Sequence, residues 1–276
     1  MPIVELNNME NDVPVLIIGA GISGLLLAQQ LRQLEIPFQI YERDSSFTAR
    51  GSGWGLTLHW SLPALHELLP EHLLSRLRET YVDLGAVERG EGSTFPFFDL
   101  TTGERKGGVP QAGENQRIRV SRERLRNLLA TDIEIQWGKS FKELSDYKTA
   151  VVAHFEDGTE VRGRMLFGCD GNRSRSMEDV NQSYVYQICI SGSTEKEPFR
   201  SVAERITRPT NDERIALLRE AAQSLAEPFR RFVNSISDST TVKQLDLDDW
   251  VFPNNHVAAS TYTLVGDAAH AMTMCR

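Results

Sequence analysis

The first strongly patterned stretch of the chain is an apolar run that leads into closely spaced glycines. Val13–Ile18 is rich in β-branched residues, and the apolar residues Leu25–Ala28 follow a few positions later. Three glycines lie between them: Gly19, Gly21 and Gly24. A short apolar run bounded by glycine is typical of a buried parallel strand, and the apolar positions after it are spaced for a helix. The pattern therefore predicts a strand, a tight turn and a helix over about 22–34.

The G-x-G-x-x-G spacing of this turn suits a phosphate ligand. The first glycine lets the chain turn, the second lets a pyrophosphate approach the backbone, and the third lets the helix pack on the strand. The N–H groups at the start of the helix then face the phosphates. A second apolar run, Pro37–Tyr41, ends in Glu42, which lies where a carboxylate can bind a pair of ribose hydroxyls. The alternative interpretation is a glycine-rich turn that binds nothing.

Shorter elements follow along the chain. The spacing predicts a glycine-rich loop at Arg50–Leu56, two helices separated by Pro70, and a hairpin around Thr102-Gly103 in a segment, 85–113, with little helical period. Ser61 and Ser121 are expected to cap helices. The helices are predicted at Ser61–Leu69, Glu71–Thr80 and Arg122–Ala130, and the strands at Arg117–Val120, Ile133–Trp137, Phe141–Leu144, Val151–Phe155, Met165–Cys169 and Thr261–Val265.

The longest helical pattern begins at Asn211-Asp212. Its apolar positions alternate at spacings of three and four, which marks one face that we interpret as core packing rather than a cofactor contact. Pro228 is expected to kink this helix. The stripe consists of Ile215, Leu218, Ala222, Leu225, Phe229 and Phe232.

Composition and charge narrow the class of protein. The 276 residues are 40% hydrophobic and 25% charged, with a net charge of −8; this balance is ordinary for a globular protein and opposes binding to nucleic acid. Cys169, Cys189 and Cys275 have no metal-ligand spacing, so no metal site is predicted. The chain has no apolar run long enough to span a membrane and no signal-peptide pattern at its start, so we expect a soluble, cytoplasmic protein.

Three fingerprints stand in a fixed order: the glycine turn, Cys169-Asp170-Gly171-x-x-Ser174, and Gly266-Asp267-Ala268-Ala269-His270. Together with Arg122-x-x-Leu125, they resemble the FAD-dependent monooxygenases of the para-hydroxybenzoate hydroxylase class over nearly the whole chain. The resemblance implies an α/β fold, in which a Rossmann-like FAD-binding domain with a parallel sheet is joined to a smaller, reduced α+β substrate domain. We assign 1–84, 114–180 and 258–276 to the first domain, and 85–113 and 181–257 to the second.

The same resemblance implies roles for individual residues. The glycine turn would bind the FAD pyrophosphate, Glu42 the adenosine ribose, and Arg43 would lie beside the adenine. Arg122 could instead be a surface arginine, Asp170 a turn residue, and His270 a structural part of its turn. The remaining implied contacts are Arg50 and Gly55 along the flavin side, Arg122 from its helix, Asp170 and Gly171 near the pyrophosphate, and Gly266 with Asp267 at the ribityl chain. No catalytic acid or base is identified.

The activity implied by the resemblance is that NAD(P)H reduces FAD and that dioxygen then supplies one oxygen atom to a small organic substrate and one to water. Hydroxylation or epoxidation of an aromatic or apolar molecule is expected; the oligomeric state is not predicted. Met177 and Met274 stand where relatives carry arginine and proline, and the interval from Asp170 to Asp267 is short. We therefore expect a truncated version, and two alternatives stay open: a flavin-dependent reductase on the same fold, and a non-catalytic flavin-binding protein.

Overall fold

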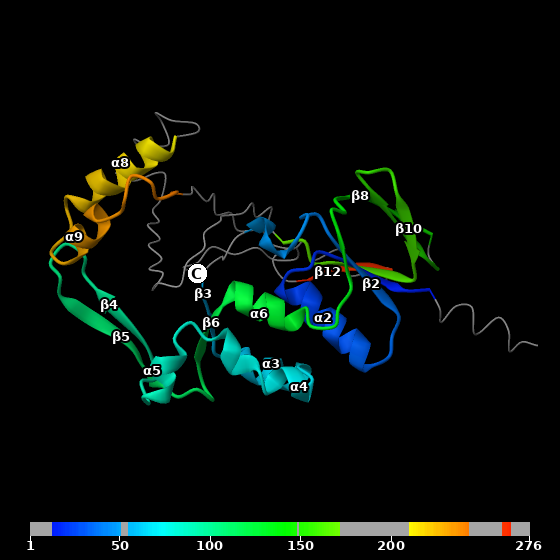
Figure 1. The fold of residues 1–276 in the computed structure, drawn as a ribbon, viewed down its shortest axis with the longest axis horizontal. Helices are drawn as coiled ribbons and strands as arrows, with labels where there is room; N and C mark the ends of the chain where they lie inside the picture. The colour runs from blue at the N-terminus through cyan, green and yellow to red at the C-terminus, as the bar shows by residue number, and fades with distance from the viewer. Residues whose placement is uncertain (1–12, 51–54, 148, 172–209, 243–260, 266–276) are drawn as a thin grey trace, which may run out of the picture. The chain divides into compact units, whose positions relative to one another are not determined.

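The structure is a computed structural model that describes residues 13–50, 55–147, 149–171, 210–242 and 261–265 (Figure 1). These residues fall into two compact units. Unit 1 draws on 1–93, 113–181 and 247–276, and unit 2 on 94–112 and 182–246.

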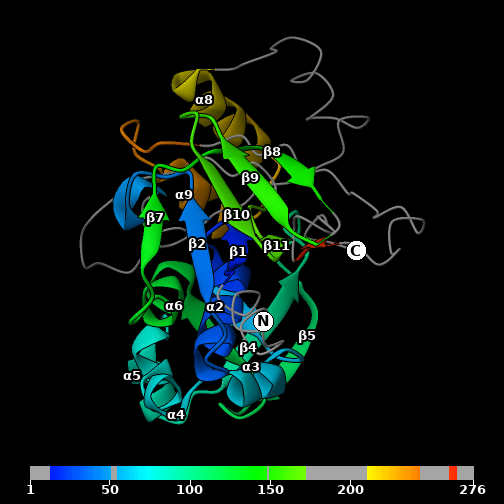
Figure 2. The ribbon, with the colours of Figure 1, turned by 90° about the vertical axis from the view of Figure 1, so that its right-hand side faces the viewer.

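A parallel sheet of five strands forms the centre of unit 1. Its order is β12-β11-β1-β2-β7, and each neighbouring pair is parallel (Figure 2). The strands are β1 (Val15–Ile18), β2 (Phe38–Glu42), β7 (Ile135–Trp137), β11 (Met165–Gly168) and β12 (Tyr262–Leu264). A parallel sheet with crossover helices is the arrangement expected of a Rossmann-like domain, so the predicted α/β class is confirmed.

The central strand β1 is covered on both faces, which explains its continuous apolar sequence. Val15 and Ile17 point into the larger core with the helices, whereas Leu16 and Ile18 point into a second core with Val151, Phe155 and other residues of a smaller sheet. All four side chains are at most 4% exposed. A strand buried on both faces has no position for a polar side chain, and the sequence shows none.

Helices α2 (Ile22–Gln33) and α6 (Arg122–Leu129) lie side by side on one face of this sheet (Figure 1). A buried amide joins them, because Gln29 Nε2 on α2 donates to the carbonyl oxygens of Leu129 at 2.7 Å and Thr131 at 2.9 Å. As predicted, Ser121 caps α6: its Oγ accepts a hydrogen bond from the Arg124 N–H at 3.3 Å.

The second face of the sheet is covered by three antiparallel strands, β8 (Phe141–Asp146), β9 (Val151–Phe155) and β10 (Glu160–Gly163). The ring of Phe155 on β9 lies 4.8 Å from the ring of Tyr41 on β2. The predicted Asp157-Gly158 turn joins β9 to β10, and Gly158 takes the left-handed conformation with φ +81° that such a turn needs.

Three predictions for the segment between β2 and α6 are wrong. Gly55 and Leu56 do not lie in a loop: they begin β3 (Gly55–Leu58), which pairs with β6 (Ile118–Ser121), and the chain before them contains η1 (Phe47–Arg50). Ser61 stands at the N-cap of α3 (Leu62–Leu68), but its side chain makes no capping bond. The segment predicted to have little helical period contains α5 (Leu84–Glu88).

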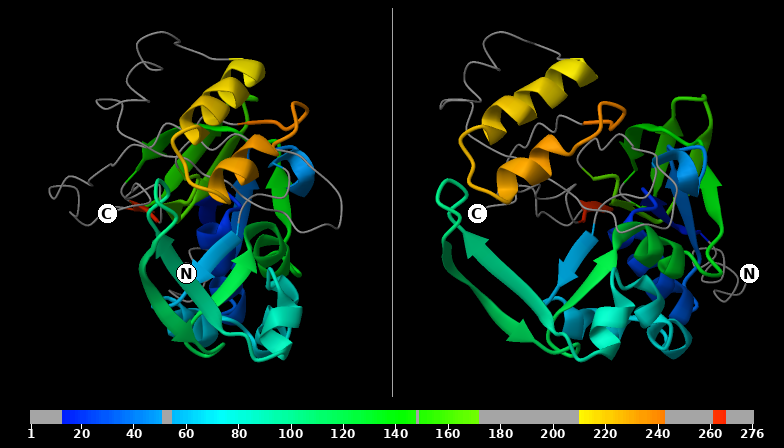
Figure 3. Two further views of the ribbon diagram at one scale, coloured as in Figure 1. Left: turned by 90° about the vertical axis from the view of Figure 1, so that its left-hand side faces the viewer. Right: turned by 60° about the vertical axis from the view of Figure 1, so that its left-hand side comes forward.

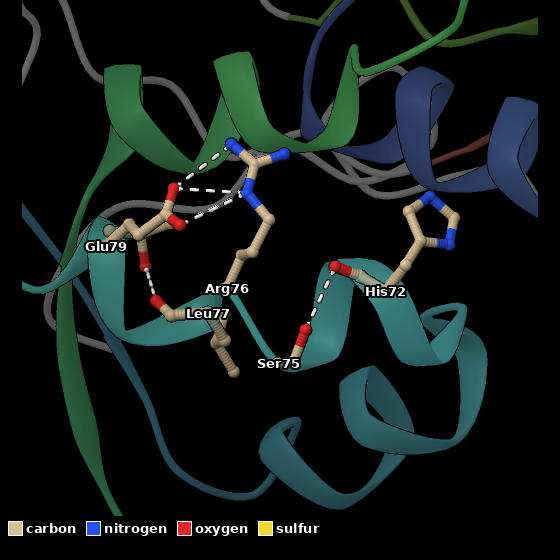
Figure 4. A network of polar contacts seen from close by, with 6 residues as sticks. His72, Ser75, Arg76, Leu77 and Glu79 are labelled. Carbon is tan, nitrogen blue, oxygen red and sulfur yellow. Dashed lines mark hydrogen bonds and ion pairs between the residues drawn. The ribbon is translucent and has the colours of Figure 1, made fainter.

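The predicted helix over Glu71–Thr80 is interrupted. It consists of α4 (Glu71–Leu74) and the 3₁₀ turn η2 (Leu77–Thr80). Figure 4 shows why the two pieces are stable: Ser75 Oγ donates to the His72 carbonyl at 3.1 Å, and the Arg76 guanidinium binds both carboxylate oxygens of Glu79 at 3.1–3.3 Å. The Ser75 hydroxyl thus satisfies a backbone carbonyl at the break, and the Arg76–Glu79 ion pair spans the first turn after it.

Apart from Ser93, which belongs to unit 1, the predicted hairpin of β4 (Ser93–Phe98) with β5 (Arg105–Ala112) lies in unit 2. Unit 2 also contains the helices α8 (Asn211–Ala222) and α9 (Phe229–Asn234) (Figure 3). The expectation of one kinked helix is wrong. The first helix stops at Ala222, and a second helix, α9, starts after Pro228, which stands at its N-cap. The break also shifts the apolar face, because Val233 is buried whereas Phe232 is 42% exposed.

Candidate functional site

The carboxyl ends of β11, β1 and β2 meet at one edge of the parallel sheet, and the predicted site residues gather there. In open α/β sheets, ligands bind outside this edge, where neighbouring strands lead to connections on different sides. From β1 the chain passes directly into Gly19–Gly24 and then into α2. The turn is fixed to both neighbouring strands: Gly19 N–H donates to the Tyr41 carbonyl at 2.7 Å, and Cys169 N–H donates to the Ile18 carbonyl at 2.7 Å.

The packing of the protein itself accounts for two of the three glycines. Gly19 has φ +103°, and a Cβ there would lie 2.5 Å from the Cys169 carbonyl oxygen. A Cβ on Gly24 would overlap the carbonyl oxygen of Gly19 and lie 3.3 Å from the Cys169 Cβ. Both neighbours are backbone or rigidly held atoms, so neither position can accommodate alanine without a shift of the turn.

The middle glycine is different. Gly21 has φ −79° and ψ −175°, an extended conformation that other residues adopt. Among the described residues, a Cβ on Gly21 would have one neighbour within 4 Å, the Cys169 carbonyl oxygen at 3.8 Å, which is an ordinary contact. In the part of the chain that the structure describes, no close packing contact therefore requires glycine at position 21. No described side chain covers the backbone at this position, the N-cap of α2.

Glu42, at the end of β2, points its carboxylate at the glycine turn. It is 2% exposed, and its Oε2 accepts a hydrogen bond from the Ala20 N–H at 2.9 Å. Its Oε1 accepts from the Asp44 N–H at 3.2 Å. The carboxylate of Glu42 therefore lies next to the glycine turn. Two backbone donors, the N–H groups of Ala20 and Asp44, hold its two oxygens.

Arg126 is a site residue that the sequence analysis missed. It is 5% exposed, although it lies on α6 among leucines. Its Nε donates to the Ala20 carbonyl at 2.7 Å, and its Nη2 lies 3.6 Å from Glu42 Oε2. The guanidinium also lies over the rings of Phe47 and Trp137, 5.0 and 5.6 Å from their centroids. One sequence signal could have indicated that Arg126 is buried: it lies beside Leu125 and four residues before Ala130, at the border of the apolar face of the helix.

The second fingerprint lies against the first. Residues 169 and 170 follow β11, and the Cα of Asp170 would be 2.7 Å from a Cβ on Gly19. Asp170 is exposed and Gly171 takes a left-handed φ of +64°. Burial, with a smaller contribution from the Asp170 carboxylate, raises the pKa of the Cys169 thiol to about 12. The thiol is therefore a protonated packing group below the turn rather than a nucleophile.

Arg122 and Gly55 are also neighbours, since Gly55 on β3 pairs with Ser121, the residue before Arg122. Arg122 is partly buried at the first position of α6. A Cβ on Gly55 would meet the guanidinium of Arg119 at 3.1–3.3 Å, so Arg119, which the sequence analysis did not select, covers this glycine.

The other selected residues are placed only in part. Arg43 follows β2 and is exposed. For Arg50 the structure describes the backbone alone, as the last residue of η1. Gly266, Asp267 and His270 lie outside the described residues, which end at Val265; the Val265 N–H donates to the Gly168 carbonyl at 2.8 Å, so β12 ends at the same sheet edge as β11.

The parallel sheet and the glycine turn at its carboxyl edge define a Rossmann-like α/β class of protein. Two solved structures have a similar fold. The 2,6-dihydroxypyridine-3-hydroxylase from Arthrobacter nicotinovorans matches with a TM-score of 0.64 and 19% identity over 94% of this chain and 78% of its own. HpxO from Klebsiella pneumoniae, solved with FAD and uric acid, matches with a TM-score of 0.67 and 16% identity over 96% and 75%.

Sequence relatives establish the family. A probable FAD-dependent monooxygenase from Arthroderma benhamiae is 37% identical over 95% of this chain and 77% of its own length. The FAD-dependent monooxygenase dbaB from Emericella nidulans is 31% identical over 96% and 82%. No protein-family model matches the chain. The chain belongs to the FAD-dependent monooxygenases, and the predicted enzyme class and the cofactor FAD are confirmed.

The comparison also bears on length. The alignment with the Arthroderma relative is 333 positions long, whereas the chain has 276 residues. Segments of that relative therefore have no counterpart within the aligned part of this chain. Among the residues that the structure describes, no helix is both long enough and apolar enough to cross a membrane.

Proposed function

We propose that this chain binds FAD with its pyrophosphate at Gly21 and uses NAD(P)H and dioxygen to hydroxylate or epoxidise a small aromatic or apolar molecule. The observation that carries the proposal is the contrast between the glycines. Gly19 and Gly24 are required by the turn, whereas glycine at position 21 meets no packing need among the described residues. An open backbone at a helix N-terminus is what an approaching phosphate requires.

The electrostatics of the turn support this placement. Gly21 is the N-cap of α2, no side chain caps this helix, and the first turn contains no acidic residue. The N–H groups and the positive end of a twelve-residue helix therefore face the proposed pyrophosphate without a competing carboxylate. The carboxylate of the buried Glu42, which belongs to β2, accepts a hydrogen bond from the Ala20 N–H directly before this N-cap.

Glu42 is also proposed to bind the adenosine ribose. A carboxylate oxygen accepts more than one hydrogen bond, so ribose hydroxyls can share Oε1 with the Asp44 N–H. We further propose that Arg43 lies beside the adenine, that Arg122 and Asp170-Gly171 border the pyrophosphate, and that Arg50 and Gly55 follow the flavin side. Gly266 and Asp267 are proposed for the ribityl chain. The same proposal assigns the FAD-binding residues to 1–84, 114–180 and 258–276. It assigns the substrate contacts to 85–113 and 181–257.

When bound, FAD supplies hydride acceptance from NAD(P)H and the activation of dioxygen. The chain's own residues bind and orient it: backbone N–H groups of the glycine turn take the phosphates, the Glu42 carboxylate fixes a sugar, and the apolar residues around β1 exclude water below the turn. No side chain among the described residues is proposed as a catalytic acid or base.

Two glycine variants test the FAD site. In Gly21→Ala, the added methyl group blocks the phosphate approach, so FAD binding measured by titration of flavin fluorescence should weaken at least tenfold, while the unfolding free energy without FAD stays within about 1 kcal/mol of the wild type. In Gly24→Ala, the unfolding free energy itself should fall by more than about 2 kcal/mol because the methyl group meets a backbone oxygen. Tight FAD binding by Gly21→Ala would contradict the site.

A second measurement tests the activity. The purified, FAD-loaded chain should consume NADPH or NADH and dioxygen, and isotopically labelled dioxygen should leave one labelled oxygen atom in an aromatic or apolar product. Reduction of a substrate without oxygen uptake would favour the flavin-dependent reductase. FAD binding without any NAD(P)H oxidation would favour the non-catalytic flavin-binding protein.

A further inference from the structure

The geometry points to Arg126 as a positioning residue that sets the direction of the Gly21 N–H toward the pyrophosphate. This inference rests on the proposed FAD site and adds to it a residue that does not itself touch the cofactor. It follows from the way two buried, oppositely charged side chains bind a single residue of the turn, Ala20.

Both backbone groups of Ala20 are bound from the protein side. Its N–H donates to Glu42 Oε2 at 2.9 Å, and its carbonyl oxygen accepts from Arg126 Nε at 2.7 Å. The carboxylate and the guanidinium are themselves 3.6 Å apart, and both residues are at most 5% exposed. Charge-assisted hydrogen bonds in such a buried setting are stronger than neutral ones, so the orientation of Ala20 is closely fixed.

Because the peptide bond is planar, the orientation of Ala20 also fixes the direction of the next donor, the Gly21 N–H. In a trans peptide, the carbonyl of one residue and the N–H of the following residue point in opposite directions. Because the Ala20 carbonyl points down to Arg126, the Gly21 N–H points away from it, toward the open side of the turn. The preceding peptide behaves in the same way: the Ala20 N–H points to Glu42, and the Gly19 carbonyl points to Gly24, where no side chain stands in its way.

Arginine has the chemistry that this role needs. Its Nε binds the carbonyl while Nη2 approaches Glu42, and its flat face lies over the rings of Phe47 and Trp137. A lysine carries the same charge, but its ammonium is a single point that cannot hold two acceptors in a fixed plane and stack on rings. Arg126→Lys therefore keeps the charge balance with Glu42 and loses the fixed direction of the Ala20 carbonyl.

The test compares Arg126→Lys with Arg32→Lys. Arg32 forms an exposed ion pair with Asp132 at 3.2 Å in the same unit and makes no described contact with the turn. FAD dissociation constants are measured well below the unfolding temperature of each apoprotein, so that every variant is fully folded. Arg126→Lys is expected to weaken FAD binding by about ten- to a hundredfold and to shift the phosphorus NMR signals of bound FAD, whereas Arg32→Lys changes neither.

The outcomes separate this inference from the proposed site. If the wild type does not bind FAD, the proposed site fails. If the wild type binds FAD and Arg126→Lys binds it as tightly with unchanged phosphorus signals, the site stands and the role of Arg126 is overturned, even if the apoprotein has become less stable. Arg126→Gln, which keeps a planar donor without charge, provides the second variant and should also bind more weakly. If neither variant folds, Arg126 serves the fold and the positioning role is overturned.

Discussion

The carboxylate of Glu42 and the guanidinium of Arg126 lie 3.6 Å apart in the interior, and each binds one end of Ala20 in the glycine turn. Helix α6 thus supplies a cation, Arg126, to the glycine turn. The sequence pattern had indicated only the glycines and one acid, Glu42. A buried ion pair of this kind costs desolvation, which its mutual attraction and its backbone partners offset. Its value to the protein therefore lies in the geometry that it imposes on the turn.

The effects of substituting Glu42 and Arg126 on the unfolding free energy should depend strongly on each other. Glu42→Gln leaves a buried guanidinium without its counter-charge and is expected to lower the unfolding free energy, measured with urea in the absence of FAD, by about 3–5 kcal/mol. The double variant Glu42→Met/Arg126→Met should be less destabilised than the sum of its single variants by about 1–3 kcal/mol. Strict additivity of the two single changes would contradict the coupling.

Cys169 should be unreactive in the native protein. Its thiol is buried beneath Gly19 and Gly24, and burial together with Asp170 raises its pKa to about 12. At pH 8 the nucleophilic thiolate is therefore scarce, and iodoacetamide should label Cys169 only after unfolding in urea. Peptide mapping by mass spectrometry measures the labelling of this cysteine separately from the others. Labelling of folded protein at the rate of a free thiol would show that the buried position is wrong.

The loop before β6 should contribute a pH-dependent stabilisation. Arg78 binds both carboxylate oxygens of Glu114 at 2.8 and 2.9 Å, and the Tyr81 hydroxyl donates to the same carboxylate at 2.7 Å. The arginine bonds, and then the tyrosine bond, lower the pKa of Glu114 below its ordinary value of 4.5, while burial partly opposes them. The folded protein therefore favours the ionised carboxylate. This stabilisation is present above about pH 4.5 and is lost as the pH falls through the lower, folded pKa.

Glu114→Gln tests that dependence. Urea midpoints of the wild type and the variant should differ at pH 7, and the difference should shrink at pH 3, because this pH lies below the ordinary pKa of 4.5 and part of the stabilisation is then lost. The effect is expected to be modest because the pair is partly exposed to solvent. Arg76→Gln is a useful control, since Arg76 pairs with Glu79 three residues away and does not contact Glu114. A difference that is equal at both pH values would contradict the assignment.

Helix α8 should depend on its first residues. Thr210 and Glu213 form a capping box in which the Thr210 Oγ1 accepts from the Glu213 N–H at 3.3 Å and the Glu213 carboxylate accepts from the Thr210 N–H at 2.7 Å. Thr210→Ala should therefore lower the unfolding free energy by about 1 kcal/mol. The measurement is urea unfolding followed by circular dichroism. Ser224→Ala, which removes an exposed hydroxyl beyond the end of the helix, is the matched control and should change little.

The sequence by itself determined the parts of this protein that depend on neighbouring residues. The strand, glycine turn and helix of 15–33, the acid at the end of β2, the Ser121 cap and the Asp157-Gly158 turn were all predictable, because propensity, φ requirements and local hydrogen bonds act over a few positions. The order of three fingerprints was enough to indicate the family, which the relatives then established.

Tertiary structure alone decided what no local pattern encodes. It separated Gly19 and Gly24, whose side-chain space is filled by backbone, from Gly21, whose side-chain space no described residue fills closely. It also placed Arg126 under a turn more than a hundred residues earlier in the chain. At Pro228, packing replaced a predicted kink by a break and buried Val233 in place of Phe232. Each outcome depends on atoms brought together from distant segments, and the free energy of those contacts is larger than the local preferences that a sequence pattern reports.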